Sequence, residues 1–316
     1  MRQIIQALPV PEDERILCGI GNAEDAAVYK IDDNKALILS IDVITPLVDD
    51  AKAFGAIAAA NALSDIFAMG GQGVASLSFI STPSDIPDDI RAQIMQGAGE
   101  LALANGAPIL GGHSVEGKDL YMGLAVIGEG KPDHLLTNDS LEADLALILT
   151  KPIGTGTLTT AVKNDALSID DIGDALEGMQ QTNRAAVNLM LQYGAKSATD
   201  ITGFGLLGHL AEQVRASNVQ AVIQKELIPI YENALKTIDM GYKTRANARN
   251  GEYVHSQTEI TGEIDTVLLD PQTSGGLLIA VPRAESNPLQ EELVRAGYKH
   301  TREIGFTQAG TGIILN

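Results

Sequence analysis

The sequence has few basic residues, a single cysteine and no long apolar run, and each shortage excludes a class of protein. Its 316 residues contain 22 Lys and Arg against 41 Asp and Glu, a net charge of −19. Such a chain lacks the basic surface that nucleic acid requires, so no nucleic-acid partner is expected. One cysteine forms no intramolecular disulfide. Because no stretch reaches about 18 apolar residues and the N-terminus lacks a secretory pattern, we expect a cytoplasmic protein without a membrane partner.

The chain also lacks a P-loop, because no G-x-x-x-x-G-K-[ST] pattern occurs. This absence excludes the commonest way of holding a nucleotide triphosphate by backbone amides and a lysine. The acidity itself does not exclude an anionic nucleotide, since divalent cations and local amides supply positive potential. A dispersed, solubilising surface charge is the simpler interpretation of the acidity.

Hydrophobic residues make up 45% of the chain, and its length is typical of about two domains. Strand and helix patterns mix throughout, which predicts an α/β fold of the α+β type. We expect a division near residues 145–155, giving domains 1–150 and 151–316. The predicted strands are 26–31, 36–43, 73–80, 121–128, 145–150, 266–269, 277–281 and 312–315, the first two forming a hairpin. The predicted helices are 51–69, 87–105, 168–176, 181–191 and 288–296, together with one that follows a Gly-rich turn starting at residue 203 and continues to residue 214.

The most informative helix is the one over residues 51–69, because it is apolar on most faces yet carries Asp65. Asn61 lies four residues earlier and therefore on the same face. A buried carboxylate is costly unless it is paired, protonated or bound to a metal. Taken alone, such an aspartate is more often a structural hydrogen-bonding group than a metal ligand.

Three further aspartates lie at strand ends or loop mouths. Asp25 precedes a strand, Asp42 ends one, and Asp200 precedes a Gly-rich turn. Carboxylates at such places are able to converge on a hard cation such as Mg²⁺, which prefers oxygen ligands. Each has a local alternative: a turn for Asp25, a strand end for Asp42 and a helix cap for Asp200.

Gly-rich segments occur at residues 111–114, 203–205 and 274–276. Their amides suit phosphate oxygens, although a tight turn is the favoured interpretation of each one alone. Cys18 lies in an apolar stretch, where a thiol has a raised pKa and is inert, so we expect a structural role for it.

Taken together, these segments resemble selenophosphate synthetase (selenide, water dikinase), in the superfamily of aminoimidazole ribonucleotide synthetase. The resemblance runs in the family's order from about Gly19 to the C-terminus. It rests on residues 22–29, 41–49, 58–71, 111–114, 199–210 and 269–278. The segments 58–71 and 199–210 are the most specific.

The resemblance implies ATP-dependent synthesis of selenophosphate from selenide and water, with release of AMP and orthophosphate. It implies a homodimer of two-domain α/β subunits whose N-terminal strands pool into a barrel at the interface. Magnesium ligands map onto Asp25, Asp65 and Asp200. Nucleotide contacts map onto Asn22, Ala23, Glu24 and Asp42, together with Gly112, His113 and Ser114, the last three reaching in from the partner subunit.

One family element has no counterpart in this sequence: a Gly-rich N-terminal segment with a reactive Cys or selenocysteine and a lysine three residues later. Cys18, Arg2 and Lys30 do not match it. We therefore expect nucleotide and magnesium binding, and leave the catalytic residue unassigned. A truncated chain, a divergent relative and a start misassigned after a selenocysteine codon are the open explanations, and the last is our favoured hypothesis.

Overall fold

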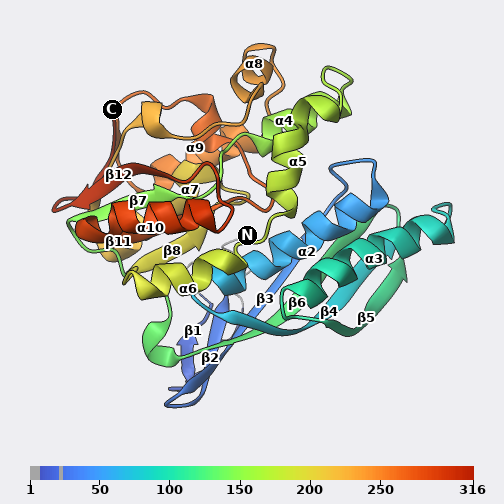
Figure 1. The fold of residues 1–316 in the computed structure, drawn as a ribbon, viewed down its shortest axis with the longest axis horizontal. Helices are drawn as coiled ribbons and strands as arrows, with labels where there is room; N and C mark the ends of the chain where they lie inside the picture. Colours follow the sequence, from blue (N-terminus) through green and yellow to red (C-terminus); the bar gives the residue numbers. More distant parts are fainter. Residues whose placement is uncertain (1–7, 21–23) are drawn as a thin grey trace.

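The computed structural model describes residues 8–20 and 24–316, which form two mixed sheets with helices packed on them (Figure 1). The first sheet has the strand order β1-β2-β3-β6-β4-β5 and is antiparallel except where β4 pairs with β5. Its strands are β1 (Ile16–Cys18), β2 (Ala27–Asp32), β3 (Lys35–Ile44), β4 (Gln72–Thr82), β5 (Ile109–Glu116) and β6 (Tyr121–Gly130).

Two long helices, α2 (Ala51–Ala68) and α3 (Asp88–Ala104), lie side by side on one face of this sheet (Figure 1). The Asp50 carboxylate begins α2 by accepting a hydrogen bond from the Ala53 amide at 2.8 Å. Gly70, at φ 77°, follows the end of the helix. Because side chains alternate along a strand, every second residue of β3, including Ala36 and Ile38, faces α2 and is buried.

The opposite face of the first sheet is apolar and open. Ile41 on β3, Ala125 on β6 and Leu77 on β4 lie in register across three neighbouring strands. Ile41 is 66% exposed and Leu77 49% exposed. An exposed apolar row on a sheet marks a surface suited to association with another protein.

The second sheet has the strand order β10-β13-β9-β12-β7-β11-β8. Its strands are β7 (Leu145–Leu149), β8 (Ser197–Asp200), β9 (Gln220–Ile223), β10 (Ile260–Thr261), β11 (Leu277–Pro282), β12 (Arg302–Gln308) and β13 (Gly312–Leu315). The helices of this half are α4 (Thr155–Lys163), α5 (Gly173–Gln180), α6 (Arg184–Gln192), α7 (Gly205–Ser217), α8 (Ala234–Asp239), α9 (Arg245–Gln257) and α10 (Arg283–Arg295). Short 3₁₀ turns are η1 (Pro132–His134), η2 (Asp170–Ile172), η3 (Lys225–Leu227) and η4 (Thr266–Leu269).

Strand β7 is buried on both faces and separates two hydrophobic cores. Ala146 and Ile148 belong to the core that contains α6, α10 and the inner residues of α2. Leu147 and Leu149 belong to the core beneath α7. Because α2 packs against the first sheet and also against α5, α6 and β8, it joins the two halves and is buried nearly all round.

Most of the predicted elements are confirmed, including the β2–β3 hairpin and both long helices of the first half. The predicted strand 266–269 is wrong, because this segment forms η4; a short apolar run does not reveal which buried conformation it adopts. The tight turn favoured for residues 111–114 is also wrong, because they pair with β4 as part of β5. The helix expected from 288 begins at Arg283 and includes Pro288. Within the described residues, no helix is both long and apolar enough to cross a membrane.

Gly55 and Gly97 allow α2 and α3 to pack closely against each other. A Cβ on Gly97 would lie 1.9 Å from the Lys52 carbonyl oxygen, and one on Gly55 would lie 1.9 Å from that of Ile94. We expect Gly97→Ala to lower the free energy of unfolding by about 2 kcal/mol, since the helices must separate. Urea unfolding at 25 °C measures this change.

The matched control is Gly99→Ala in the same helix, where a Cβ meets nothing within 4 Å. Helix propensity alone favours alanine there by about 0.5–1 kcal/mol. Equal effects of the two substitutions would contradict the role given to the α2–α3 contact.

Candidate active site

Four aspartates lie near one another where the two sheets join. One is in a loop, two are in strands and one is in a helix. Asp25 precedes β2, Asp42 lies near the end of β3, Asp65 lies in α2 and Asp200 ends β8. The first three come from the N-terminal half and the fourth from the C-terminal half. The sequence motifs that seemed separate therefore face one another across the junction.

Two polar contacts bring β3 and α2 together at this point. The Ser40 hydroxyl donates a short hydrogen bond to Oδ2 of Asp65. Asn61 Nδ2 donates to Oδ2 of Asp42 at 2.7 Å. Ser40 and Asp42 alternate along β3, so both side chains face α2, and the four-residue spacing of Asn61 and Asp65 matches them.

The remaining two aspartates are held by contacts across the halves. The Thr199 hydroxyl, one residue before Asp200, donates to Oδ1 of Asp25 at 2.8 Å. The hydroxyl of Ser64 in α2 acts on Asp200 and lowers the pKa of its carboxyl. Ser64 in turn accepts from Asn183 Nδ2 at 2.9 Å, next to the start of α6. The junction is therefore cross-linked by hydrogen bonds that pass through the carboxylates themselves.

Burial and mutual repulsion raise the pKa values of this group. Burial, reinforced by Asp200, raises the pKa of Asp42 to about 7. The same two causes raise the pKa of Asp25 and of Asp65 well above the usual range. Burial also raises the pKa of Glu24 to about 7. Several carboxylates in one dry space favour protons or cations as partners.

Asp200 is the most acidic of the cluster because it has two stabilising neighbours. Burial raises its pKa to about 6, while the Ser64 hydroxyl and the charge of Lys151 lower it. Burial lowers the pKa of Lys151 to about 7, and Asp200 opposes that shift. Lys151 is the only cation that acts on Asp200 among the interactions of the described residues.

The donor set fits a hard divalent cation. Oδ2 of Asp200 is buried and has no hydrogen-bond partner, so one oxygen is free for a ligand. Among residues 8–20 and 24–316, no three His, Cys, Asp or Glu side chains converge as one metal-binding group. A cation held here therefore takes few protein oxygens at once, and water or a bound anion completes its shell, as Mg²⁺ prefers.

The segment Gly112–Ser114 lies away from this cluster within one chain. It belongs to β5, at the edge of the first sheet, three strands from β3. At about 4.8 Å per strand, about 14 Å separates the backbone of β5 from that of β3. Gly112 has a packing reason of its own, because a Cβ there would lie 2.2 Å from the Ser78 carbonyl oxygen.

Two predicted nucleotide contacts, Asn22 and Ala23, lie outside the described residues. Glu24 is described, and its Oε2 accepts a hydrogen bond from the Asn138 amide at 2.8 Å. The Glu24 carboxylate is thus tied to the segment that joins β6 to β7. Cys18 is buried and unpaired, and burial raises the pKa of its thiol to about 12, which supports its structural interpretation.

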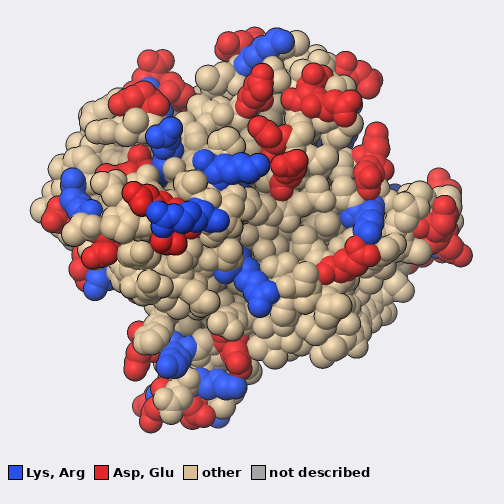
Figure 2. All heavy atoms as spheres, in the orientation of Figure 1, with Lys and Arg blue, Asp and Glu red and all other residues tan. Residues whose placement is uncertain are grey.

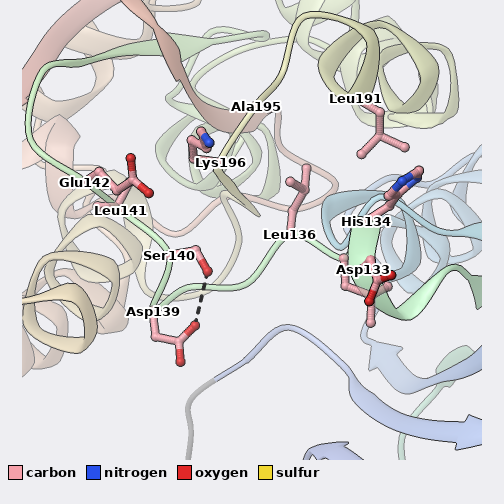
Figure 3. A pocket seen from close by; sticks show the side chains of 11 residues that line it. Asp133, His134, Leu136, Asp139, Ser140, Leu141, Glu142, Leu191, Ala195 and Lys196 are labelled. Atoms are coloured by element: carbon pink, nitrogen blue, oxygen red, sulfur yellow. Dashed lines mark hydrogen bonds between the residues drawn. The ribbon is translucent and has the colours of Figure 1, made fainter. Parts of the chain in front are cut away.

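A cavity of about 490 Å³ opens beside that joining segment, but it is not the carboxylate site (Figure 3). None of the four clustered aspartates lines it. Its polar lining includes Asp139, Ser140 and Lys196. The Ser140 hydroxyl donates to the Asp139 carboxylate at 3.4 Å. Figure 2 shows acidic side chains at many separate places on one face, so the acidity is spread over this surface.

Several functional neighbours of the cluster were missed by reasoning from sequence: Ser40, Ser64, Lys151 and Asn183. Lys151 could have been identified from the sequence, because a lysine that directly follows the apolar segment 145–150 is buried only if its charge is paired. The others are small polar residues without a distinctive pattern.

Comparison with known proteins adds the family. Residues 23–130 match the N-terminal domain, and residues 142–316 the C-terminal domain, of AIR synthase related protein. The chain is 39% identical over 300 residues to a selenide, water dikinase of Clostridioides difficile (strain 630), covering 93% of this chain and 85% of the relative. It is 38% identical over 319 residues to that of Carboxydothermus hydrogenoformans, covering 100% and 92%.

Solved structures share the fold at lower identity. A chain of the HypE–HypF complex aligns with a TM-score of 0.76 at 17% identity, covering 100% of this chain and 94% of that one. AaThiL complexed with AMPPCP and TMP aligns with a TM-score of 0.72 at 18% identity, covering 92% and 87%. At these identities the structures establish the architecture, whereas the sequence relatives establish the narrower group. The chain belongs to the selenide, water dikinase family, within the wider group of AIR synthase related proteins.

Proposed function

We propose that this protein is a selenide, water dikinase that converts ATP, selenide and water into selenophosphate, AMP and orthophosphate. The observation that carries this proposal is the buried carboxylate cluster at the junction, in a chain whose relatives at 37–39% identity are named for that reaction. A kinase or synthetase of the wider group acting on another small molecule, or a nucleotide-binding protein without turnover, is not favoured.

The cluster supports a magnesium-bound nucleotide. We assign Asp25, Asp65 and Asp200 as ligands of the Mg²⁺ that accompanies the nucleotide, with no ion held by all three at once; the unpartnered Oδ2 of Asp200 is the supporting feature. Mg²⁺, when bound, neutralises the charge of the phosphates during transfer. The residues of this chain do the rest: Asn61 and Ser40 orient Asp42 and Asp65, and Thr199 orients Asp25.

For the nucleotide itself, we propose contacts from Asn22, Ala23, Glu24 and Asp42, with Gly112, His113 and Ser114 supplied by a second subunit. The distance between β5 and β3 within one chain supports supply from another chain. The open apolar row Ile41–Ala125–Leu77 supports a homodimer in which first sheets from two subunits pool into a barrel. We further propose a cytoplasmic location and domains at residues 1–150 and 151–316.

Replacing Asp65 tests the metal assignment. Asp65→Asn keeps the shape of the side chain but removes its charge, so we expect the Mg²⁺ concentration for half-maximal ATP binding to rise at least about tenfold. Titration calorimetry at several Mg²⁺ concentrations measures this. Asp89→Asn, on the exposed first turn of α3, removes the same charge and should change nothing. An unchanged magnesium requirement in Asp65→Asn would rule out Asp65 as a ligand.

The nucleotide product tests the reaction class. With ATP, Mg²⁺ and selenide, we expect AMP and orthophosphate, together with a phosphorus–selenium species detectable by ³¹P NMR. ADP as the final product, in the presence of another acceptor, would instead indicate a kinase of the wider group. Mixtures without selenide provide the control.

A charge on the open sheet face tests the subunit arrangement. We expect the wild-type protein to have twice the chain mass of 33.3 kDa by light scattering, and Ile41→Glu to be monomeric because the interface would bury its charge. The monomer should bind ATP poorly, since it lacks the β5 of a second subunit. Leu103→Glu on α3, equally exposed at 66% but away from this face, is the control. Tight ATP binding by a monomer would exclude contacts from a second subunit.

A further inference from the structure

Lys151 is a buried lysine whose hydrogen-bonding capacity is completely used. The residue is 2% exposed, and its Nζ donates to the carbonyl oxygens of Gly178, Gln181 and Ser274 at 3.0, 2.6 and 2.8 Å. An ammonium group has three protons, and all three are directed at backbone oxygens. Lys151 therefore has no donor left for a phosphate, and its role must be exerted through the segments it holds.

Those segments come from distant parts of the C-terminal half. Gly178 lies in the last turn of α5 and Gln181 directly follows that helix, where unpaired carbonyls and the helix dipole favour a cation. Ser274 lies in the loop between η4 and β11 and has a left-handed backbone, φ 48°. After it, Gly276 passes so close that a Cβ would lie 2.4 Å from the Lys151 backbone nitrogen. The loop therefore contacts Lys151 twice: Ser274 accepts from its ammonium group, and Gly276 packs against its backbone.

The backbone of this loop is hydrogen-bonded to the carboxylate site through Asn61. The amide of Ser274 donates to Oδ1 of Asn61 at 2.8 Å, and Nδ2 of Asn61 donates to Oδ2 of Asp42 at 2.7 Å. The Ser274 peptide units therefore connect the ammonium of Lys151 to a carboxylate of the other sheet. Without this amide, the Oδ1 side of Asn61 is unsupported, and the hydrogen bond to Asp42 alone holds the side chain.

We propose that Lys151 is a positioning residue, which holds the Ser274 loop so that its amide orients Asn61 and thereby Asp42 for the magnesium-bound nucleotide. The proposal rests on the proposed function of this site. It differs from a counter-ion role, in which Lys151 would only offset the negative charge near Asp200. The two roles predict changes of opposite sign in magnesium affinity when Lys151 is replaced. Loss of a counter-ion lets a cation bind more tightly, whereas loss of positioning makes it bind more weakly.

The test is Lys151→Met, which keeps the length of the side chain without its charge or donors. Mg²⁺ dependence of ATP binding is measured on the full-length folded protein at 10 °C. Deuterium exchange of residues 270–276 is followed without nucleotide. We expect the Mg²⁺ concentration for half-maximal ATP binding to rise about tenfold, the scale of outer-shell changes, and exchange in this loop to accelerate. If Lys151→Met does not fold, Lys151→Gln is measured in the same way, with the same expectation.

Tyr298→Phe is the matched control. Tyr298 is 1% exposed and its hydroxyl donates to the Thr182 carbonyl oxygen at 2.9 Å, beside the same α5–α6 connection; this bond does not involve Ser274. It should lose thermal stability and keep the wild-type Mg²⁺ requirement. Tighter magnesium binding in Lys151→Met, an effect below twofold, or an equal shift in Tyr298→Phe would overturn the proposal. The wild-type protein separates the two claims: if it shows no Mg²⁺-dependent ATP binding, the proposed function itself fails.

Discussion

Repulsion among carboxylates buried in one small space is the constraint on which the rest of this structure depends. Burial raises the pKa values of Asp25, Asp42, Asp65 and Asp200, and the charge of Asp200 raises those of the other three further, whereas the charge of Lys151 lowers that of Asp200. Such an arrangement lowers the stability of the fold unless a ligand compensates it. It persists because hydrogen bonds from Ser40, Asn61 and Thr199 hold Asp65, Asp42 and Asp25 in place.

That constraint explains the unusual composition of α2. A helix on the surface of a sheet needs one apolar stripe, but α2 is covered by the first sheet on one side and by α5, α6 and β8 on the other. Alanine is therefore the commonest residue of the helix, and Asn61, Ser64 and Asp65 are its buried polar exceptions. These three residues point to the junction, so the helix supplies both the packing between the halves and the polar groups of the site.

The sequence was sufficient to predict the elements with strong, local patterns. The length and apolar character of residues 51–69 predicted α2, and the four-residue spacing placed Asn61 and Asp65 on one face, as the contacts with Asp42 and Ser40 confirm. Strand β8 was missed because Ser197–Asp200 is short and polar, and its conformation depends on pairing with β11. Residues 111–114 looked like a turn because their glycines permit one, yet parallel pairing with β4 makes them a strand.

The contacts that complete the site are harder still to predict, because they use backbone groups. Lys151 binds carbonyl oxygens near residues 178, 181 and 274, and no side-chain pattern identifies a carbonyl as an acceptor. Asn61 likewise accepts from a backbone amide 213 positions away. A backbone group at that distance is brought into place only by the whole fold. The two halves are therefore required together: the first supplies three of the four aspartates, and the second supplies Asp200 and the groups of Thr199 and Ser274 that hold Asp25 and Asn61.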